Sequence, residues 1–97
     1  MAIKVIVELH AKPGRREELQ RLIEGIVAEQ GPSQSGFLGS TRYEVLADPD
    51  MLVEIADWES AEARLAHMQE SAATGAYAPM ADMLAAPFRA TVISPLT

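Results

Sequence analysis

The side chains best suited to chemistry in this sequence are its single tryptophan, Trp58, and one of its two histidines, His67. The indole of Trp58 can stack on a flat substrate and donate a hydrogen bond, or it can simply be the largest apolar anchor of the core. A neutral imidazole at His67 can act as a base near pH 7. On a helical wheel, however, His67 points away from the direction that Leu65 and Met68 define, which fits either a cleft rim or a solvated surface.

Softer side chains could form a pocket wall around such a centre. Three methionines, Met68, Met80 and Met83, fall with Tyr77 on or near predicted helices, where flexible thioethers can adapt to a ligand or act as ordinary core filler. Tyr43 is predicted on the helix-covered side of its strand, with its hydroxyl directed at a substrate or a backbone carbonyl. Trp58 and His67 are therefore our candidate catalytic residues. The candidate substrate-binding residues are Tyr43, Tyr77, Met68, Met80 and Met83.

The sequence lacks the groups on which many redox and hydrolytic enzymes depend. It has no cysteine, which excludes disulfides, thiolate catalysis and cysteine-based metal sites. It also has no Gly-rich phosphate loop, flavin fingerprint or paired-histidine motif, so we expect no cofactor and no metal. Any oxygenase chemistry would then draw its electrons from the substrate, because a phenol or hydroquinone that loses a proton can reduce oxygen. Such a site needs a base, a dry aromatic pocket and donors for the developing anion.

The charge of the chain bears on its partners and location. A net charge of −6 argues against binding to nucleic acid or anionic lipid. The basic residues are dispersed, with no block beyond Arg15-Arg16. The first strand-like run carries charges at Lys4 and Glu8, and it is too short for a signal peptide or a membrane span. We therefore expect a cytoplasmic protein that binds neither nucleic acid nor a membrane.

Hydrophobic periodicity predicts the elements that position these residues. Alternating apolar and polar side chains indicate strands, and a 3.6-residue repeat indicates helices, one of them capped by Ser60. The predicted order is strand 3–10, helix 15–30, loop 31–36, strand 37–46, turn 47–50, strand 51–58, helix from 61 to a break at 74–75, short helix 78–85 and strand 88–94. This order predicts an α+β, ferredoxin-like split βαβ fold, a four-stranded antiparallel sheet with helices on one face. We expect a single domain spanning residues 1–97.

The predicted sheet has more apolar surface than its own helices can cover. The helix-covered face is assigned Tyr43, Val53 and Ile55 among others. The opposite face, toward which Arg42 is predicted to point, is assigned a further apolar set: Ile6, Leu38, Leu46, Leu52, Ala56, Trp58 and Ile93. Covering such a patch is favourable by roughly 25 cal/mol per Å², and a monomer seldom leaves one exposed. We expect a homodimer joined through these faces, the alternative being a monomer with a mixed, solvated face.

These residues, in this order and spacing, resemble the antibiotic biosynthesis monooxygenase family over nearly all of the chain. The matching segments are Lys12-Pro13-Gly14-Arg15, Glu17-Glu18-Leu19, Gly36-Phe37, Tyr43-Glu44-Val45, Asp48-Pro49-Asp50, Asp57-Trp58-Glu59-Ser60, Glu62-Ala63 and His67. The resemblance implies a dimeric α+β barrel. The spacing from Trp58 to His67 also matches that of the family.

The resemblance implies an activity as well, namely cofactor-independent oxidation of hydroquinone- or anthrone-like substrates by oxygen. A related branch degrades haem with the help of an asparagine on the first strand, but this chain contains no asparagine, which argues against haem degradation. The leading hypothesis is a cofactor-independent monooxygenase of small aromatic quinols or phenols, bound between sheet and helices in each subunit. The alternatives are a non-catalytic dimeric barrel that binds a small hydrophobic or phenolic ligand, and a cofactor-free isomerase of a carbonyl compound.

Overall fold

The structure is a computed structural model that describes residues 2–96. Its elements follow the predicted order of strand, helix, strand, strand, helix, short helix and strand, with one turn of 3₁₀-helix after the first helix. They are β1 (Ile3–His10), α1 (Arg16–Gln30), the 3₁₀ turn (Gly31–Ser33), β2 (Phe37–Val45), β3 (Asp48–Trp58), α2 (Ala61–Thr74), α3 (Ala78–Ala81) and β4 (Arg89–Ile93).

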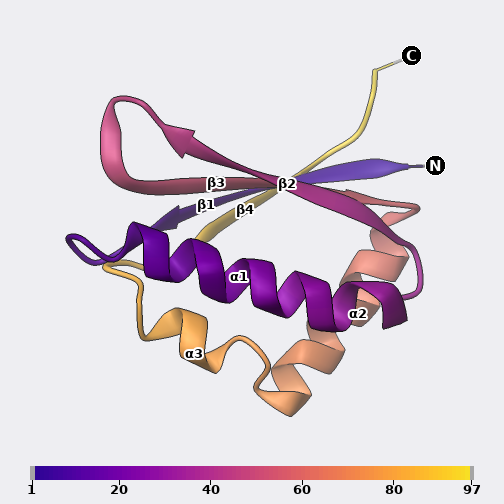
Figure 1. Ribbon diagram of the computed structural model, residues 1–97. Coiled ribbons are helices and arrows are strands. Elements are labelled where there is room, and N and C mark those ends of the chain that lie inside the picture. Colours follow the sequence, from indigo (N-terminus) through magenta and orange to yellow (C-terminus); the bar gives the residue numbers. More distant parts are fainter. Residues whose placement is uncertain (1, 97) are drawn as a thin grey trace.

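The strands form one antiparallel sheet in the order β2-β3-β1-β4. The helices all lie on one face of it, as Figure 1 shows, with α1 running across the sheet and α2 and α3 beside it. This arrangement confirms the predicted ferredoxin-like α+β fold. The two central strands, β1 and β3, therefore form the floor beneath the helices, and a site between the layers has to be built on them.

The element boundaries differ from the prediction mainly at the turns. The hairpin between β2 and β3 turns at Leu46 and Ala47, and the Asp48-Pro49-Asp50 segment, predicted as part of the turn, already belongs to β3. Helix α3 ends at Ala81 instead of reaching 85. Ser60 caps α2 as predicted, since its hydroxyl accepts a hydrogen bond from the Ala63 N–H.

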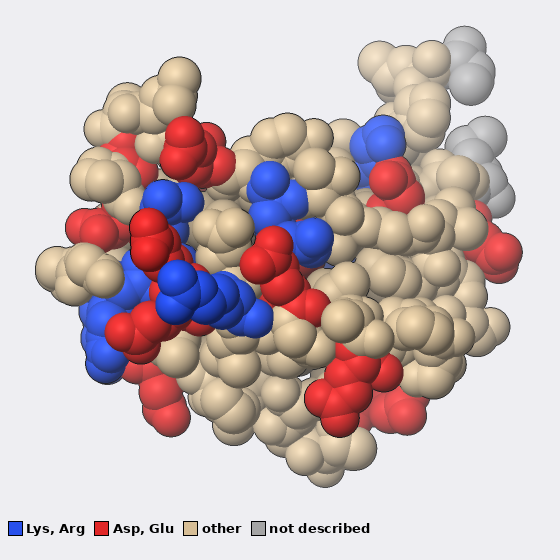
Figure 2. Space-filling model, viewed as in Figure 1, with Lys and Arg blue, Asp and Glu red and all other residues tan. Residues whose placement is uncertain are grey.

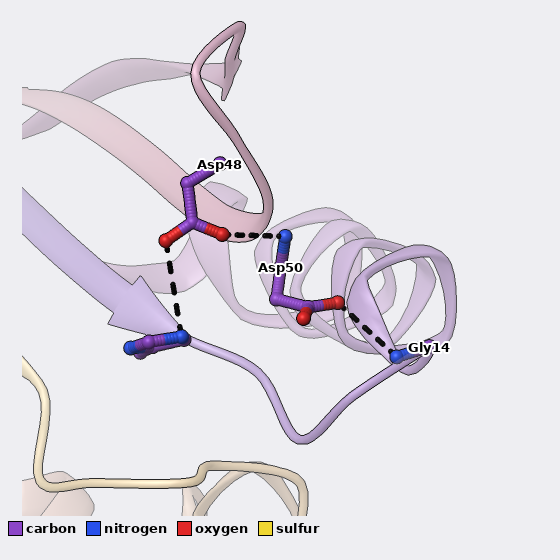
Figure 3. A network of polar contacts seen from close by, with 4 residues as sticks. Gly14, Asp48 and Asp50 are labelled. Carbon is purple, nitrogen blue, oxygen red and sulfur yellow. Dashed lines mark hydrogen bonds and ion pairs between the residues drawn. The ribbon is translucent and has the colours of Figure 1, made fainter.

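The hairpin is tied to the start of α1 by a short polar network (Figure 3). The Asp48 Oδ1 accepts a hydrogen bond from the Asp50 N–H at 3.0 Å, and its Oδ2 lies 3.9 Å from the His10 Nε2. The Asp50 Oδ1 in turn accepts a hydrogen bond from the Gly14 N–H at 3.1 Å. Gly14 has φ +77°, a left-handed conformation that favours glycine. The Pro-Gly and Asp-Pro-Asp segments thus fix where α1 begins over the sheet.

The predicted facing of β2 and β3 is wrong, because the two strands present the opposite sides to the helices. Val5 pairs with Ala56 and Leu9 with Leu52, so Leu52, Ala56 and Trp58 share the helix-covered face with the apolar side of β1. The residues that take the other face are Tyr43, Val53 and Ile55. Arg42 pairs with Glu54 and so lies on the helix side, contrary to the prediction.

A bulge explains the error on β2. Phe37 pairs with Trp58 and faces the helices as predicted, but the register shifts between Phe37 and Gly39. The extra residue reverses the alternation for the rest of the strand, so that Tyr43 faces away from the helices. Gly39, with φ +138°, takes up the distorted backbone of this bulge.

The core under the helices has two parts. Around Leu9 and Leu19, α1 packs on β1 and β3, and Met80 closes this cluster from α3. Around Ala56 and Trp58, the neighbouring ends of β1 and β3 form a second cluster. Both are apolar and well buried, and space between them is available for a cavity.

Among residues 2–96, no helix or second sheet covers the opposite face of the sheet (Figure 1). Tyr43 on β2 and Ile93 on β4 are 48% and 39% exposed, and Ile6, Val53 and Ile55 lie between them. On the side of the molecule seen in Figure 2, basic side chains lie among acidic ones. Within residues 2–96, no helix combines the length and apolar character needed to cross a bilayer. The cytoplasmic location stays a prediction.

Candidate functional site

A cavity of about 110 Å³ lies between the sheet and the helices. Its floor comes from the inward face of β1, β3 and β4, including Val5, Val7 and Ala56. Its roof comes from α1, which contributes Ile23 and Val27 among others. The lining includes members of both core clusters, so the cavity fills the space between them. The wall is mainly apolar, with a few polar side chains gathered in it.

Most of the candidate residues meet at this cavity. Its lining includes Trp58, His67, Tyr77, Met68 and Met80. Two candidates do not reach it.

Tyr43, predicted to face the helices, lies on the open face of the sheet because of the β2 bulge. Met83 packs against the core cluster around Leu9 and Leu19. The geometry therefore gives no support to Tyr43 and Met83 as part of the pocket.

His67 is buried, not placed at a rim or in solvent as the helical wheel suggested. Only 8% of its surface is exposed, whereas Leu65, predicted to be buried, is 55% exposed. The inward stripe of α2 runs through His67 and Ser71, one turn apart. The wheel was oriented by the apolar residues of α2, but the two fully buried residues of this helix, His67 and Ser71, are polar.

A chain of hydrogen bonds runs through His67. Its Nδ1 lies 2.8 Å from the Gln34 Oε1, and its Nε2 lies 2.7 Å from the Tyr77 hydroxyl. Because the Gln34 oxygen only accepts, a neutral His67 donates from Nδ1 and leaves Nε2 to accept from the Tyr77 O–H. Both ring nitrogens are therefore engaged. The Tyr77 oxygen keeps lone pairs that can accept a hydrogen bond from a ligand.

The rings of Phe37, Trp58 and His67 lie one after another beside this chain of hydrogen bonds. Phe37 and Trp58 have ring centroids 5.2 Å apart at an interplanar angle of 60°. Trp58 and His67 are 5.1 Å apart at 34°. These are tilted arrangements of the kind that aromatic side chains favour. They fix the Trp58 indole as one flat wall of the cavity.

Burial changes the proton affinity of both members of the His67–Tyr77 pair. The pKa of His67 is lowered, chiefly because burial disfavours the imidazolium; the charge of Glu70 opposes this shift and that of Arg64 adds to it. The pKa of Tyr77 is raised, again chiefly by burial. Near neutral pH the pair is thus a neutral imidazole and a neutral phenol, as the hydrogen-bond pattern requires.

Comparison with protein families agrees with this architecture. The family model for antibiotic biosynthesis monooxygenases matches residues 2–78, which is most of the chain. The chain belongs to the antibiotic biosynthesis monooxygenase family. Comparison with curated proteins gave no match.

Solved structures show the same fold at low sequence identity. A candidate antibiotic biosynthesis monooxygenase from Bordetella bronchiseptica superposes with a TM-score of 0.85 at 15% identity, over 99% of this chain and 98% of that one. Rv0793 from Mycobacterium tuberculosis gives 0.80 at 22%, over 100% and 97%. A variant of SnoaB, a cofactor-independent oxygenase from Streptomyces nogalater, gives 0.82 at 12%, over 99% and 94%. At these identities the likeness concerns the fold.

In this antibiotic biosynthesis monooxygenase domain, Glu54 is a site residue that the sequence reasoning missed. It lines the cavity from β3, and its side chain is only 16% exposed. Its Oε2 lies 3.6 Å from the Arg42 Nη1, too far for a hydrogen bond, and has no hydrogen-bond partner within residues 2–96. Burial raises the pKa of Glu54, and the charge of Arg42 opposes that shift.

A signal for Glu54 was present in the sequence. On β3, a lone carboxylate stands among Leu52, Ala56 and Trp58 at a spacing of two residues, which places all four on one face. Assigning that face to the interior would have singled out Glu54 as a buried acid.

Among the described residues, no group of three or more His, Cys, Asp or Glu side chains is placed to hold a metal ion.

Proposed function

We propose that this protein is a cofactor-independent monooxygenase that oxidises small quinol- or phenol-type aromatic molecules with molecular oxygen. The observation that carries the proposal is the mainly apolar cavity of about 110 Å³ in which Trp58 and the His67–Tyr77 pair lie together. An apolar cavity of about 150 Å³ holds one benzene ring, so a volume of about 110 Å³ leaves no room for a substrate with more than one ring. The structural likeness to SnoaB, a cofactor-independent oxygenase, supports the same class of reaction.

The reaction needs no electrons beyond those of its substrate. A hydroquinone and one O₂ give a hydroxyquinone and one water, so one oxygen atom enters the ring and the other leaves as water. Deprotonation of the hydroquinone supplies the electron-rich anion that reduces oxygen. The protein has to bind the ring, exclude bulk water, and accept and return protons.

The cavity residues divide these tasks. Trp58 stacks on the substrate ring, and Met68 and Met80 form an adaptable wall. The Tyr77 oxygen accepts a hydrogen bond from a substrate hydroxyl. His67 accepts a hydrogen bond from the Tyr77 hydroxyl and so holds the Tyr77 oxygen in place.

Oxygen uptake in the presence of a panel of hydroquinones and phenols tests the proposal. The two tyrosines of the chain provide a matched pair of variants. Tyr77→Phe removes a cavity hydroxyl, and we expect it to lower the rate about 10- to 100-fold. Tyr43→Phe removes a hydroxyl on the open face, and its rate should equal that of the wild type.

Other outcomes would point to the alternatives. Binding of these compounds without oxygen uptake by the wild type would contradict the monooxygenase and favour a ligand-binding barrel. Turnover of a carbonyl compound under strictly anaerobic conditions would favour an isomerase. Equal losses in Tyr77→Phe and Tyr43→Phe would contradict the assignment of this cavity as the site.

We also propose that the chain acts as a homodimer joined through the open face of its sheet. The apolar set that supports this differs from the predicted one, since Leu52, Ala56 and Trp58 lie under the helices. In their place the open face carries Tyr43, Val53 and Ile55 together with Ile6 and Ile93. Two-fold pairing of such faces would remove a large apolar surface from water.

A further inference from the structure

Glu54 is a polar cavity residue whose hydrogen-bonding capacity is not satisfied. Its carboxylate is nearly buried, lines the cavity from the middle of β3, and has an oxygen, Oε2, without a hydrogen-bond partner among the described residues. An unpaired buried carboxylate oxygen is destabilising by itself. Oε2 itself is covered beside Arg42, so a ligand hydroxyl in the cavity would meet the other carboxylate oxygen, Oε1.

His67 and Tyr77, the other cavity groups that our proposal uses as proton acceptors or donors, are already bonded to each other. Both ring nitrogens of His67 have partners within 2.8 Å, so the imidazole can receive a substrate proton only through Tyr77. The Tyr77 oxygen can accept a hydrogen bond, but it is a weak proton acceptor, because the phenol has to give up its own proton as it takes another. Glu54 is the group that can accept a proton directly.

We propose that Glu54 is the proton acceptor for a substrate hydroxyl in this cavity, an inference that rests on the proposed function. The substrate O–H bond breaks, its proton moves to the Glu54 carboxylate oxygen that faces the cavity, and the electron pair stays on the substrate oxygen. The resulting phenolate is the species that reduces O₂. Arg42, behind the carboxylate at 3.6 Å, favours the ionised form of Glu54 and opposes the effect of burial.

Electrostatics support this role. Burial raises the pKa of Glu54, which makes its carboxylate a stronger base, and the charge of Arg42 opposes this shift. The charged and titratable groups around the cavity come from several elements: Arg42 on β2, Glu24 on α1 at 3.6 Å from Arg42, Arg64 and His67 on α2, and Tyr77 before α3. Across the sheet, Glu54 pairs with Val7 on β1, and Val7 pairs with Ala90 on β4. Both of these residues are uncharged.

The pH dependence of kcat with hydroquinone tests the inference in the wild type, Glu54→Gln and Glu24→Gln. The last is a matched control, because Glu24 contacts the same Arg42 but does not line the cavity. Wild-type kcat should rise with pH as Glu54 loses its proton. Glu54→Gln should lose this rise and lower kcat about 100-fold or more, with a much smaller change in KM. Glu24→Gln should behave as the wild type does.

A different pattern would overturn the inference. Glu54→Gln that keeps the rise with pH and a kcat within about threefold of wild type rejects Glu54 as the base. Loss of the rise in His67→Gln alone would assign the proton to the His67–Tyr77 pair. If Glu54→Gln fails to fold by circular dichroism, Glu54→Asp replaces it. The shorter side chain draws the carboxylate back, so an unchanged kcat there contradicts the inference.

Binding separates this inference from the proposed function. If the wild type oxidises no hydroquinone, the proposed function fails, but Trp58 fluorescence still reports ligand binding. The wild type should bind hydroquinone more tightly than 1,4-dimethoxybenzene, which has no hydroxyl to donate. Glu54→Leu should remove this preference. An unchanged preference in Glu54→Leu means that Glu54 does not contact the ligand hydroxyl.

Discussion

The two faces of β3 are alike in composition but differ in their surroundings. Leu52, Ala56 and Trp58 lie under the helices and are almost fully buried, whereas Val53 and Ile55 face the uncovered side. Neighbouring residues on one strand therefore experience different packing. The covered face supplies the core and the cavity, and the open face supplies the surface on which we propose self-association. The same apolar character serves stability on one side and assembly on the other.

The largest expected difference between the two faces is in the free energy of unfolding when neighbouring side chains of β3 are truncated. Leu52→Ala should lower the free energy of unfolding by about 2–5 kcal/mol, because it leaves a hole in packed core. Val53→Ala, measured at a concentration too low for self-association, should cost about 1 kcal/mol or less. Urea denaturation followed by circular dichroism measures both. Equal losses would mean that the two faces are equally packed within one chain.

A charged substitution on the open face tests whether this face binds a second copy of the chain. Ile55→Asp should weaken self-association about 100-fold or more, since a carboxylate would be buried opposite apolar side chains. Light scattering during size-exclusion chromatography should then report the mass of one chain for the variant and of two for the wild type. A wild type that stays monomeric at micromolar concentration removes the homodimer from the proposal.

The buried histidine of the hydrogen-bond chain, His67 on α2, can be compared with the more exposed histidine, His10. His67→Phe should cost about 1–3 kcal/mol, because Gln34 and Tyr77 lose a buried partner. The side chain of His10, 47% exposed at the end of β1, should tolerate the same change within about 0.5 kcal/mol. Chemical denaturation at neutral pH measures both, and similar losses would count against a special role of the buried chain.

The smallest expected effect is on the pH dependence of stability. The pKa of His67 is lowered from 6.5 on folding, so the unfolded chain binds a proton that the folded chain does not, and stability falls as the pH drops below about 6.5. The pKa of Glu54 is raised from 4.5, so stability falls as the pH rises from 4.5 until the folded carboxyl ionises. His67→Gln should remove the first slope and Glu54→Gln the second. Denaturation midpoints between pH 4 and 8 measure them, and unchanged slopes would contradict these shifts.

The sequence predicted the cavity only in part. Trp58 and Tyr77 were recognised by residue type, and the position of both at the cavity agrees with their selection. His67 was recognised for its chemistry but placed toward the rim or solvent, because Leu65 seemed to mark the buried side of α2. Glu54 was missed, since its strand face was assigned to the outside.

By itself, the sequence determined the order of the elements and hence the fold. The alternation along β1, the Pro-Gly turn before α1, the Ser60 cap and the helix end at Gly75 are local signals, and each acts through the nearest few residues. Only the tertiary structure decided which face of β2 and β3 meets the helices. Period-two alternation cannot decide this where both faces are apolar, and one bulged residue at Leu38 is enough to turn Tyr43 outward. The pairing of β3 with β1, whose covered side is unambiguous, turns Glu54 inward and completes the cavity.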